Sequence, residues 1–350
     1  MADFDRTGEN KPKGIPFFGR RLTWPGRIRL PSKNRTPPMP GAEPKKKSKL
    51  RRTILWSLLA FAVLYYPVGM MLIHRINDNM SFGTVEYQVA PGSSRAVAAT
   101  AALIQREVVD GHWAANDPFF LPGAALDNMP HFQQGMVAAL ARFTFELTDQ
   151  IGRIRGSSLT DPDLQEAAGL LQYSGTKWVF DFTTSVAPTA TSEAQYKKAR
   201  RSLLAYNDRL AVGDAVFEAR SDNLLATLDR IALDLGSSSA LLDAEVARGG
   251  GWLDTSADDA FYSVKGQMYA YYILLRELQV DFATVIEERD LGAAYQQMLD
   301  SLRTGATIDP WIIVNGKPDA LFIPSHLASQ GFMLLRARTQ LRALTNILLK

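Results

Sequence analysis

The chain has 350 residues and no cysteine. This absence excludes disulfide bonds, cysteine-ligated zinc, iron–sulfur clusters and thiol nucleophiles. It does not fix the compartment, because a chain of this length can bury enough apolar surface to fold without crosslinks. An extracytoplasmic location therefore stays open.

Histidine is also scarce, and there are only four: His74, His112, His131 and His326. No two of them lie four residues apart, and there is no H-E-x-x-H sequence, so a helical zinc site is not predicted. Glycine-rich phosphate loops and dinucleotide fingerprints are missing as well. We therefore predict no metal site, no cofactor and no assignable catalytic residue.

One acidic stretch partly matches a calcium-binding loop. Asp254, Ser256 and Asp258 have the spacing found at the start of such a loop. The complete loop needs glycine at position six and glutamate at position twelve, where this chain has Asp259 and Lys265. We interpret these acids as caps of a helix that begins near Asp258.

Acidic side chains are few at the N-terminus. Residues 1–52 contain 15 Lys/Arg, 4 Asp/Glu and 8 of the 18 prolines, which leaves 24 basic and 32 acidic side chains for the remainder. That acidic remainder would repel nucleic acid. The proline-rich segment lacks apolar periodicity, so we predict a disordered tail over residues 1–52. Its aromatic and arginine residues between Phe17 and Arg29 favour contact with anionic lipid, with docking of a cytoplasmic protein as the alternative.

A long uncharged run follows the tail. Ile54–Ile73 contains 20 residues without a charge, and a helix of that length spans about 30 Å, the thickness of a hydrocarbon core. We therefore predict a transmembrane helix over residues 53–74. A buried core helix and a cleaved signal peptide are the alternatives. No cleavage site of the small-x-small type follows the run, so an uncleaved signal anchor fits better.

Charge on the two flanks predicts the orientation. Six basic residues precede the run: Lys45, Lys46, Lys47, Lys49, Arg51 and Arg52. Only His74 and Arg75 follow it, and Asp78 comes soon after. The positive-inside rule then places the tail in the cytoplasm and the chain from about residue 76 outside it. In a bacterium with two membranes, this predicts an inner-membrane anchor and a periplasmic domain.

The remaining residues, 75–350, are predicted to form an all-helical, bundle-like domain. Apolar residues recur at steps of three and four from Met129 to Ile154, which indicates one helical stripe. Asp161 before Pro162 predicts an N-cap and a helix to about Leu171. The sequence Ser192-Glu193-Ala194-Gln195 matches a capping box for a helix that reaches about Val212.

Further helices are expected toward the C-terminus. The apolar face that begins at Leu224 is predicted to end near Gly236, and Phe261–Leu278 forms an aromatic-rich face. Residues Gly249–Gly251 predict a loop, and with it a break between subdomains. Ser325 is predicted to cap the last helix.

Two segments depart from the helical pattern. Residues 311–323 predict a small β-hairpin, because Asn315-Gly316 supplies the positive φ angles of a tight turn between two apolar runs. Val85–Val89 alternates like a short strand, and Trp178–Phe182 fits either a strand or a buried helix.

Two short motifs point to a possible hydrolase. Ser174-Gly175-Thr176-Lys177 matches S-x-x-K, and Ser221-Asp222-Asn223 matches S-D-N, which together mark serine enzymes of the penicillin-binding type. In such an enzyme, Lys177 would activate the Ser174 hydroxyl. The third mark, K-T-G on a strand, is absent, and Asp222 is also suited to capping the following helix.

Several segments in a fixed order resemble a known family: Trp113–Asp117, Leu126–Pro130, Gly152–Ser158, Tyr206–Leu210, Arg220–Leu224, Asp234–Ser237 and Asp258–Tyr262. Together they are similar to a proteobacterial family classed as domain of unknown function 2333, over roughly residues 50–350. The resemblance implies a Gram-negative inner-membrane setting with one N-terminal transmembrane helix. It implies no catalytic residues.

We therefore predict a single-pass membrane protein whose periplasmic domain binds envelope components as an adaptor or accessory subunit. The sequence leaves open whether it is an enzyme, and the lack of catalytic motifs favours a protein without catalytic activity. Its expected partners are the lipid bilayer, anionic lipid at the tail and an envelope protein. Two alternatives stay open. One is an envelope serine hydrolase that uses Ser174 and Lys177. The other is a domain that binds a small ligand or lipid in an aromatic pocket near Trp113 and Tyr269–Tyr272, a region where His112 could also line a pocket.

Overall fold

The structure is a computed structural model, and it describes residues 47–83, 87–152, 160–181, 187–249, 255–316 and 325–350. The chain divides into two units, Met1–Ile54 and Leu55–Lys350. Of the first unit, only the start of helix α1 belongs to the described residues. The bundle therefore lies wholly within the second unit.

Helix α1, Lys47–Ile73, contains the predicted apolar run. By length and composition, it is the one helix among the described residues that could cross a membrane. Its large apolar side chains are exposed, including Leu55 at 67% and Leu64 at 57%, so they do not form the core of a soluble fold. Pro67 lies inside the helix without ending it, which membrane-spanning helices tolerate.

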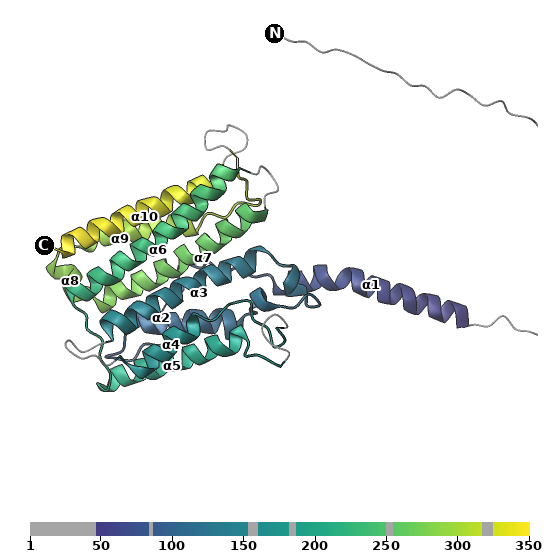
Figure 1. Cartoon of the computed structure of the whole chain (residues 1–350), viewed down its shortest axis with the longest axis horizontal. Coiled ribbons are helices and arrows are strands. Elements are labelled where there is room, and N and C mark those ends of the chain that lie inside the picture. Colours follow the sequence, from purple (N-terminus) through teal and green to yellow (C-terminus); the bar gives the residue numbers. More distant parts are fainter. Residues whose placement is uncertain (1–46, 84–86, 153–159, 182–186, 250–254, 317–324) are drawn as a thin grey trace, which may run out of the picture. The chain divides into compact units, whose positions relative to one another are not determined.

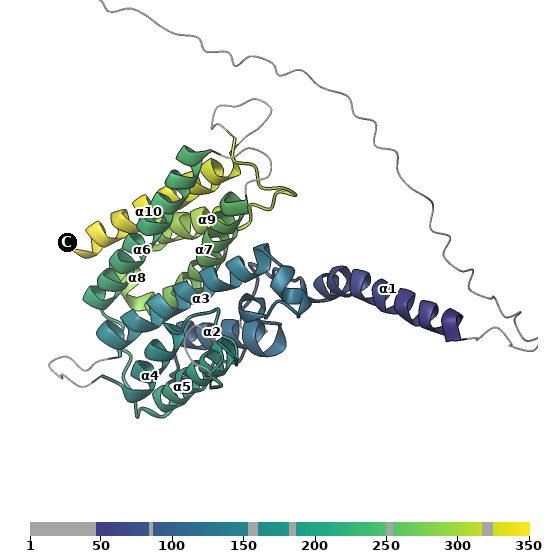
Figure 2. The ribbon, with the colours of Figure 1, turned by 45° about the vertical axis from the view of Figure 1, so that its right-hand side comes forward.

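The rest of the second unit is mainly α-helical, as predicted, and the described residues contain no strand. Its α-helices are α2 Arg95–Ile104, α3 Asn128–Glu146, α4 Pro162–Leu171, α5 Ser192–Val212, α6 Ser221–Arg248, α7 Thr255–Asp281, α8 Ala283–Glu288, α9 Gly292–Ala306 and α10 His326–Leu348. Figures 1 and 2 show these helices packed side by side as a bundle, with α6, α9 and α10 together and α4 and α5 at the other edge.

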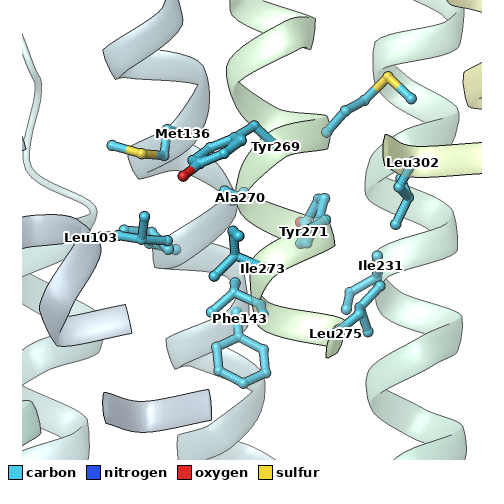
Figure 3. Close-up of a cluster of buried hydrophobic side chains, with 14 of the residues drawn as sticks. Leu103, Met136, Phe143, Ile231, Tyr269, Ala270, Tyr271, Ile273, Leu275 and Leu302 are labelled. Carbon is cyan, nitrogen blue, oxygen red and sulfur yellow. The ribbon is translucent and has the colours of Figure 1, made fainter. Parts of the chain in front are cut away.

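Helix α7 forms the centre of the bundle. It packs against α2, α3, α6, α9 and α10, and 17 of its 27 residues are buried, so almost every side of the helix faces another helix. In Figure 3, Tyr269, Tyr271 and Ile273 of α7 lie between Met136 of α3 and Ile231 of α6. This explains why α7 combines apolar, aromatic and small residues on all faces instead of carrying one apolar stripe.

Helices α3 and α7 approach each other closely through two glycines. A Cβ atom on Gly135 would lie 1.9 Å from the carbonyl oxygen of Ser263, and one on Gly266 would lie 2.0 Å from that of Phe132. The backbones of the two helices can therefore meet only because neither position carries a side chain.

Several predicted helix boundaries are confirmed. The Asp161 side chain accepts hydrogen bonds from the backbone N–H groups of Asp163 and Leu164 at the start of α4. The Ser325 hydroxyl accepts one from the N–H of Ala328 at the start of α10. Both side chains satisfy N–H groups that lack a partner within the helix.

Other boundaries differ from the prediction. The cap of α5 is Thr191, one residue before the expected Ser192, whose hydroxyl instead donates to the carbonyl of Ser174. Helix α6 does not end near Gly236 but runs on to Arg248. A Cβ atom on Gly236 would lie 2.9 Å from the guanidinium of Arg338, so this glycine makes room for a side chain of α10. Helix α7 begins at Thr255, slightly before the expected Asp258.

The predicted hairpin over 311–323 is not seen. Residues 311–316 form no strand, and 317–323 lie outside the described residues. A single antiparallel bridge joins Asn315 to Ser325, too far along the chain for a two-residue turn. The Asn315 side-chain amide donates a hydrogen bond to the carbonyl of Glu245 at the end of α6.

The other irregular segments are only partly described. Residues 85 and 86 of the proposed strand Val85–Val89 lie outside the described residues, and the remainder forms no strand. The described part of Trp178–Phe182 is neither strand nor helix. Residues 250–251 of the predicted subdomain break are also outside the described part, so that boundary stays a prediction.

Candidate functional site at the end of helix α1

The segment that leaves α1 is docked onto the bundle. Asp78 Oδ2 lies 2.8 Å from the ammonium of Lys265, and the hydroxyl of Tyr269 donates to the carbonyl of Asn79 at 3.1 Å. Arg276 donates to the carbonyl of Met80 at 2.8 Å, and Phe82 is buried in the core. Few residues therefore separate the apolar helix from the core, and those residues are held on α7.

Lys265 is the main ionic contact of this segment. Its side chain is fully buried, and its ammonium lies 2.8 Å from Asp78 and 3.1 Å from Asp309 Oδ1. A buried ammonium is tolerated only when carboxylates and hydrogen bonds replace its water. The two acids come from the segment after α1 and from the connection between α9 and α10, so Lys265 holds both at the same end of α7.

A second contact joins α1 to the loop Pro118–Leu126, here called the apolar loop. The hydroxyl of Tyr65 donates to the carbonyl of Phe120 at 3.1 Å, and that of Tyr66 donates to the carbonyl of Phe119. One helical turn further along α1, a Cβ atom on Gly69 would lie 2.3 Å from Cγ of Pro122 in the loop. Hydrogen bonds and close packing therefore both attach the apolar loop to α1.

Aromatic side chains extend from the apolar loop. Phe119 is 83% exposed and Phe120 is 47% exposed. The Phe120 ring packs edge-on against Trp178, with centroids 5.5 Å apart, and Trp178 packs edge-on against Phe180 at 5.8 Å. Edge-to-face geometry is favourable for such rings. The result is an aromatic cluster that is partly open on the surface.

Next to the apolar loop, acidic groups surround a histidine. His131 Nε2 lies 3.9 Å from Asp127 Oδ1 and 3.2 Å from Asp259 Oδ1. Burial, together with the charges of Asp127 and Asp259, raises the pKa of Asp258 to about 6. Among the described residues, Asp127, His131 and Asp259 are the group whose donor atoms could together hold a metal ion.

The sequence did not reveal this cluster. Asp127 is the residue just before α3 and His131 follows it by four residues, whereas Asp259 lies near the start of α7. Nothing in the spacing along the chain predicts that these two helix starts meet. The single histidine of the cluster has no histidine partner along the chain, so the group carries no zinc-site spacing.

The predicted hydrolase pair is held in other contacts. The hydroxyl of Ser174 is 3.0 Å from that of Thr176, and the ammonium of Lys177 pairs with Asp181. A serine paired with a neutral hydroxyl gains no nucleophilicity, and a lysine paired with a carboxylate is a poor base. Asp222 pairs with Arg220 before α6 and does not cap the helix as predicted.

The aromatic residues proposed as a pocket fill the core instead. Trp113 is buried, donates to the carbonyl of Gly175 at 2.8 Å and packs edge-on against Tyr196. Tyr269 and Tyr271 are fully buried in α7. These three side chains therefore contribute to the packed core of the bundle.

His112 lines a cavity, as the sequence interpretation allowed. Its Nε2 lies 2.6 Å from Asp117 Oδ2. The cavity has a volume of about 540 Å³, and Leu72 and Arg75 at the end of α1 and Arg106 also line it. The cavity is polar and charged, unlike the apolar pocket expected for a lipid or another hydrophobic ligand.

Comparison with known families gives one match. The family described as an uncharacterized protein conserved in bacteria (DUF2333) matches residues 79–250 and 247–349. The chain belongs to this family. No curated protein and no solved structure is similar to the chain.

The DUF2333 region contains most of the candidate site. It begins at Asn79, just after α1, and includes the apolar loop, the acidic cluster and Lys265. Helix α1 itself lies outside the matched residues. The description of the DUF2333 family gives no activity, so the chemistry of the site rests on its geometry alone.

Proposed function

We propose that this DUF2333 protein is a single-pass inner-membrane protein whose periplasmic domain binds other envelope components, as an adaptor or accessory subunit. The observation that carries the proposal is the docking of the segment after α1 onto α7. A domain that searched for distant targets would need a long linker. Here Asp78, Asn79 and Met80 are held by side chains of α7, which fits a domain kept at the membrane surface.

A groove beside α3 suits such binding. It has a volume of about 670 Å³ and mixes apolar and charged side chains. Phe145, which is 41% exposed, and Ala141 form its apolar part, while Arg142 and Asp234 form its charged part, with Nε and Oδ1 3.8 Å apart. Interfaces between proteins often combine an exposed aromatic anchor with a polar rim in this way.

Site-specific photocrosslinking in intact cells tests the proposal. A photoreactive phenylalanine analogue would replace Phe145 in the groove. The matched control replaces Phe332, which is 61% exposed on α10 and does not line the groove. We expect Phe145 to give a discrete adduct with a different envelope protein and Phe332 to give none. Adducts that contain only the protein itself at both positions would contradict the adaptor function.

A further inference from the structure

We propose that the apolar loop, Pro118–Leu126, inserts into the outer leaflet of the membrane beside α1 as a second membrane contact of the domain. The inference rests on the proposed membrane anchoring of α1 and goes beyond it. The domain would then be fixed to the lipid at two places, which limits how far it can turn about its anchor.

The composition of the loop supports insertion. Its sequence, Pro-Phe-Phe-Leu-Pro-Gly-Ala-Ala-Leu, has no charged residue and is bounded by Asp117 and Asp127. Phe119 and Phe120 are exposed although both are large and apolar. An adjoining shallow groove is lined by Met70, Met71 of α1 and Leu126 of the loop, among others. An exposed apolar surface that continues an apolar helix is most stable in contact with lipid.

The contacts with α1 fix the depth of the loop. Tyr65 and Tyr66 precede the end of α1 at Ile73 by about two helical turns, or roughly 11 Å along the axis. Their hydroxyls bind the carbonyls of Phe120 and Phe119. Tyrosines in a spanning helix gather at the lipid–water interface. The tip of the loop therefore lies at the interface or below it.

Several backbone N–H and C=O groups of the loop have hydrogen-bond partners within the protein. Lipid offers no hydrogen bonds, so polar backbone groups there need partners within the protein. Two carbonyl groups of the loop accept hydrogen bonds from tyrosine hydroxyls of α1. Within the loop, three backbone N–H groups donate to the carbonyl three residues before them: Leu121 to Pro118 at 2.8 Å, Ala124 to Leu121 at 3.1 Å and Leu126 to Gly123 at 3.0 Å. Prolines at positions 118 and 122 carry no N–H group that would need a partner.

Charged groups mark the limits of insertion. Asp117, before the loop, is paired with His112 at 2.6 Å, and the side chain of Asp127, after the loop, is 52% exposed. Trp178, which packs against Phe120 of the loop, is a residue type that collects near lipid head groups. The apolar residues of the loop are thus followed by the aromatic Trp178 and then by the charged Asp117 and Asp127, which is the order expected from the lipid to the water.

Lipid quenching of a fluorescent probe tests the proposal on the full chain in vesicles of phosphatidylethanolamine and phosphatidylglycerol. Because the chain has no cysteine, one introduced thiol labels one position. The loop variants are Phe119→Cys and Ala124→Cys, and Leu64→Cys in α1 is the positive control. Val212→Cys is the negative control, since Val212 is 72% exposed at the far end of α5.

The distance of Val212 from the apolar loop can be estimated from a contact at the start of α5. Glu193, in the first turn of α5, accepts a hydrogen bond from Asn116 just before the apolar loop at 2.6 Å. Val212 is the last residue of this helix, about 28 Å further along its axis. A probe there reports an exposed apolar position well away from the loop.

We expect quenchers carried on the lipid acyl chains to remove most of the emission at Leu64, Phe119 and Ala124, and iodide in the water to quench mainly the probe at Val212. If Leu64 is quenched by lipid while both loop positions behave like Val212, insertion is wrong and the anchor still holds. If Leu64 is not quenched by lipid either, the proposed anchoring fails and insertion fails with it.

Discussion

His326, the first residue of α10, bonds through its ring to the segment before the helix. Its Nδ1 accepts a hydrogen bond from the backbone N–H of Val314 at 3.0 Å, and burial lowers the pKa of the ring. A proton on Nδ1 would remove this acceptor and add a positive charge at a helix N-terminus, where cations are unfavourable. Protonation of His326 should therefore be less favourable in the folded protein than in the unfolded chain.

The sign of the pH dependence follows from this shift. The folded protein binds a proton at His326 less readily than the unfolded chain does, so the stabilising contribution is complete above the unfolded pKa of about 6.5 and is lost as the pH falls below it. We predict that His326→Asn, whose amide oxygen can still accept the bond, loses less stability than the natural protein between pH 7 and pH 5. Thermal unfolding across that range measures it. If the variant and the natural protein lost the same stability between pH 7 and pH 5, protonation of His326 would not be the cause.

Residues that cap helices were only partly predictable. Asp161 and Ser325 were identified from sequence because each precedes a clear helical pattern. At α5, Thr191 and Ser192 can both act as caps, and only the packing of the Ser192 hydroxyl against Ser174 decides between them. The histidine among Asp127, Asp258 and Asp259 was not predictable, because its partners come from separate helices.

At the scale of elements, the crossing of α3 and α7 depends on two glycines. We predict that Gly266→Ala lowers the free energy of unfolding by about 2–3 kcal/mol, because its methyl group would overlap the carbonyl of Phe132 and force the helices apart. Denaturation of the full chain in detergent, followed by circular dichroism, measures the change.

Gly169→Ala is the matched control for this crossing. Gly169 lies inside α4, and an added Cβ atom would meet nothing within 4 Å. Alanine favours a helix over glycine by up to about 1 kcal/mol, so this variant should be as stable as the natural protein or more stable. If both substitutions had the same effect, loss of backbone freedom and not helix contact would explain the result at Gly266.

The same elements show why sequence patterns fail locally. Gly236 was expected to end α6, since glycine weakens a helix, but it lies inside the helix where α6 meets Arg338 of α10. Asn315-Gly316 was expected to form a tight turn, but Asn315 is bound to the end of α6. At Gly236 a tertiary contact outweighs the local preference, and the contacts of both residues cannot be deduced from one sequence.

The apolar loop is a different case. Its uncharged composition is visible in the sequence, but the run is too short to span a membrane and was not singled out. Its meaning emerges only when Tyr65 and Tyr66 are seen to bind Phe120 and Phe119. In other single-pass proteins, short apolar loops that contact a predicted anchor are therefore candidates for a second membrane contact.

At the scale of the whole molecule, the mainly α-helical class and the single apolar helix follow from composition and periodicity, and both are confirmed among the described residues. These features depend on many residues at once, so single errors at caps or turns do not change them. The centre of the fold was harder to predict, because α7 is buried on nearly all sides and shows no simple stripe. Function is harder still to predict from the sequence, because it depends on a few residues that the fold brings together.

The central claim is that α1 crosses the membrane with residues 1–52 inside and the bundle outside. A membrane-impermeant thiol reagent applied to intact cells, after the outer membrane has been made permeable, tests it directly on two single-cysteine variants of the cysteine-free chain. We predict that Val212→Cys is labelled in intact cells and that Ser32→Cys is labelled only after the inner membrane is broken. Labelling of Ser32→Cys in intact cells, or protection of Val212→Cys until lysis, would contradict it.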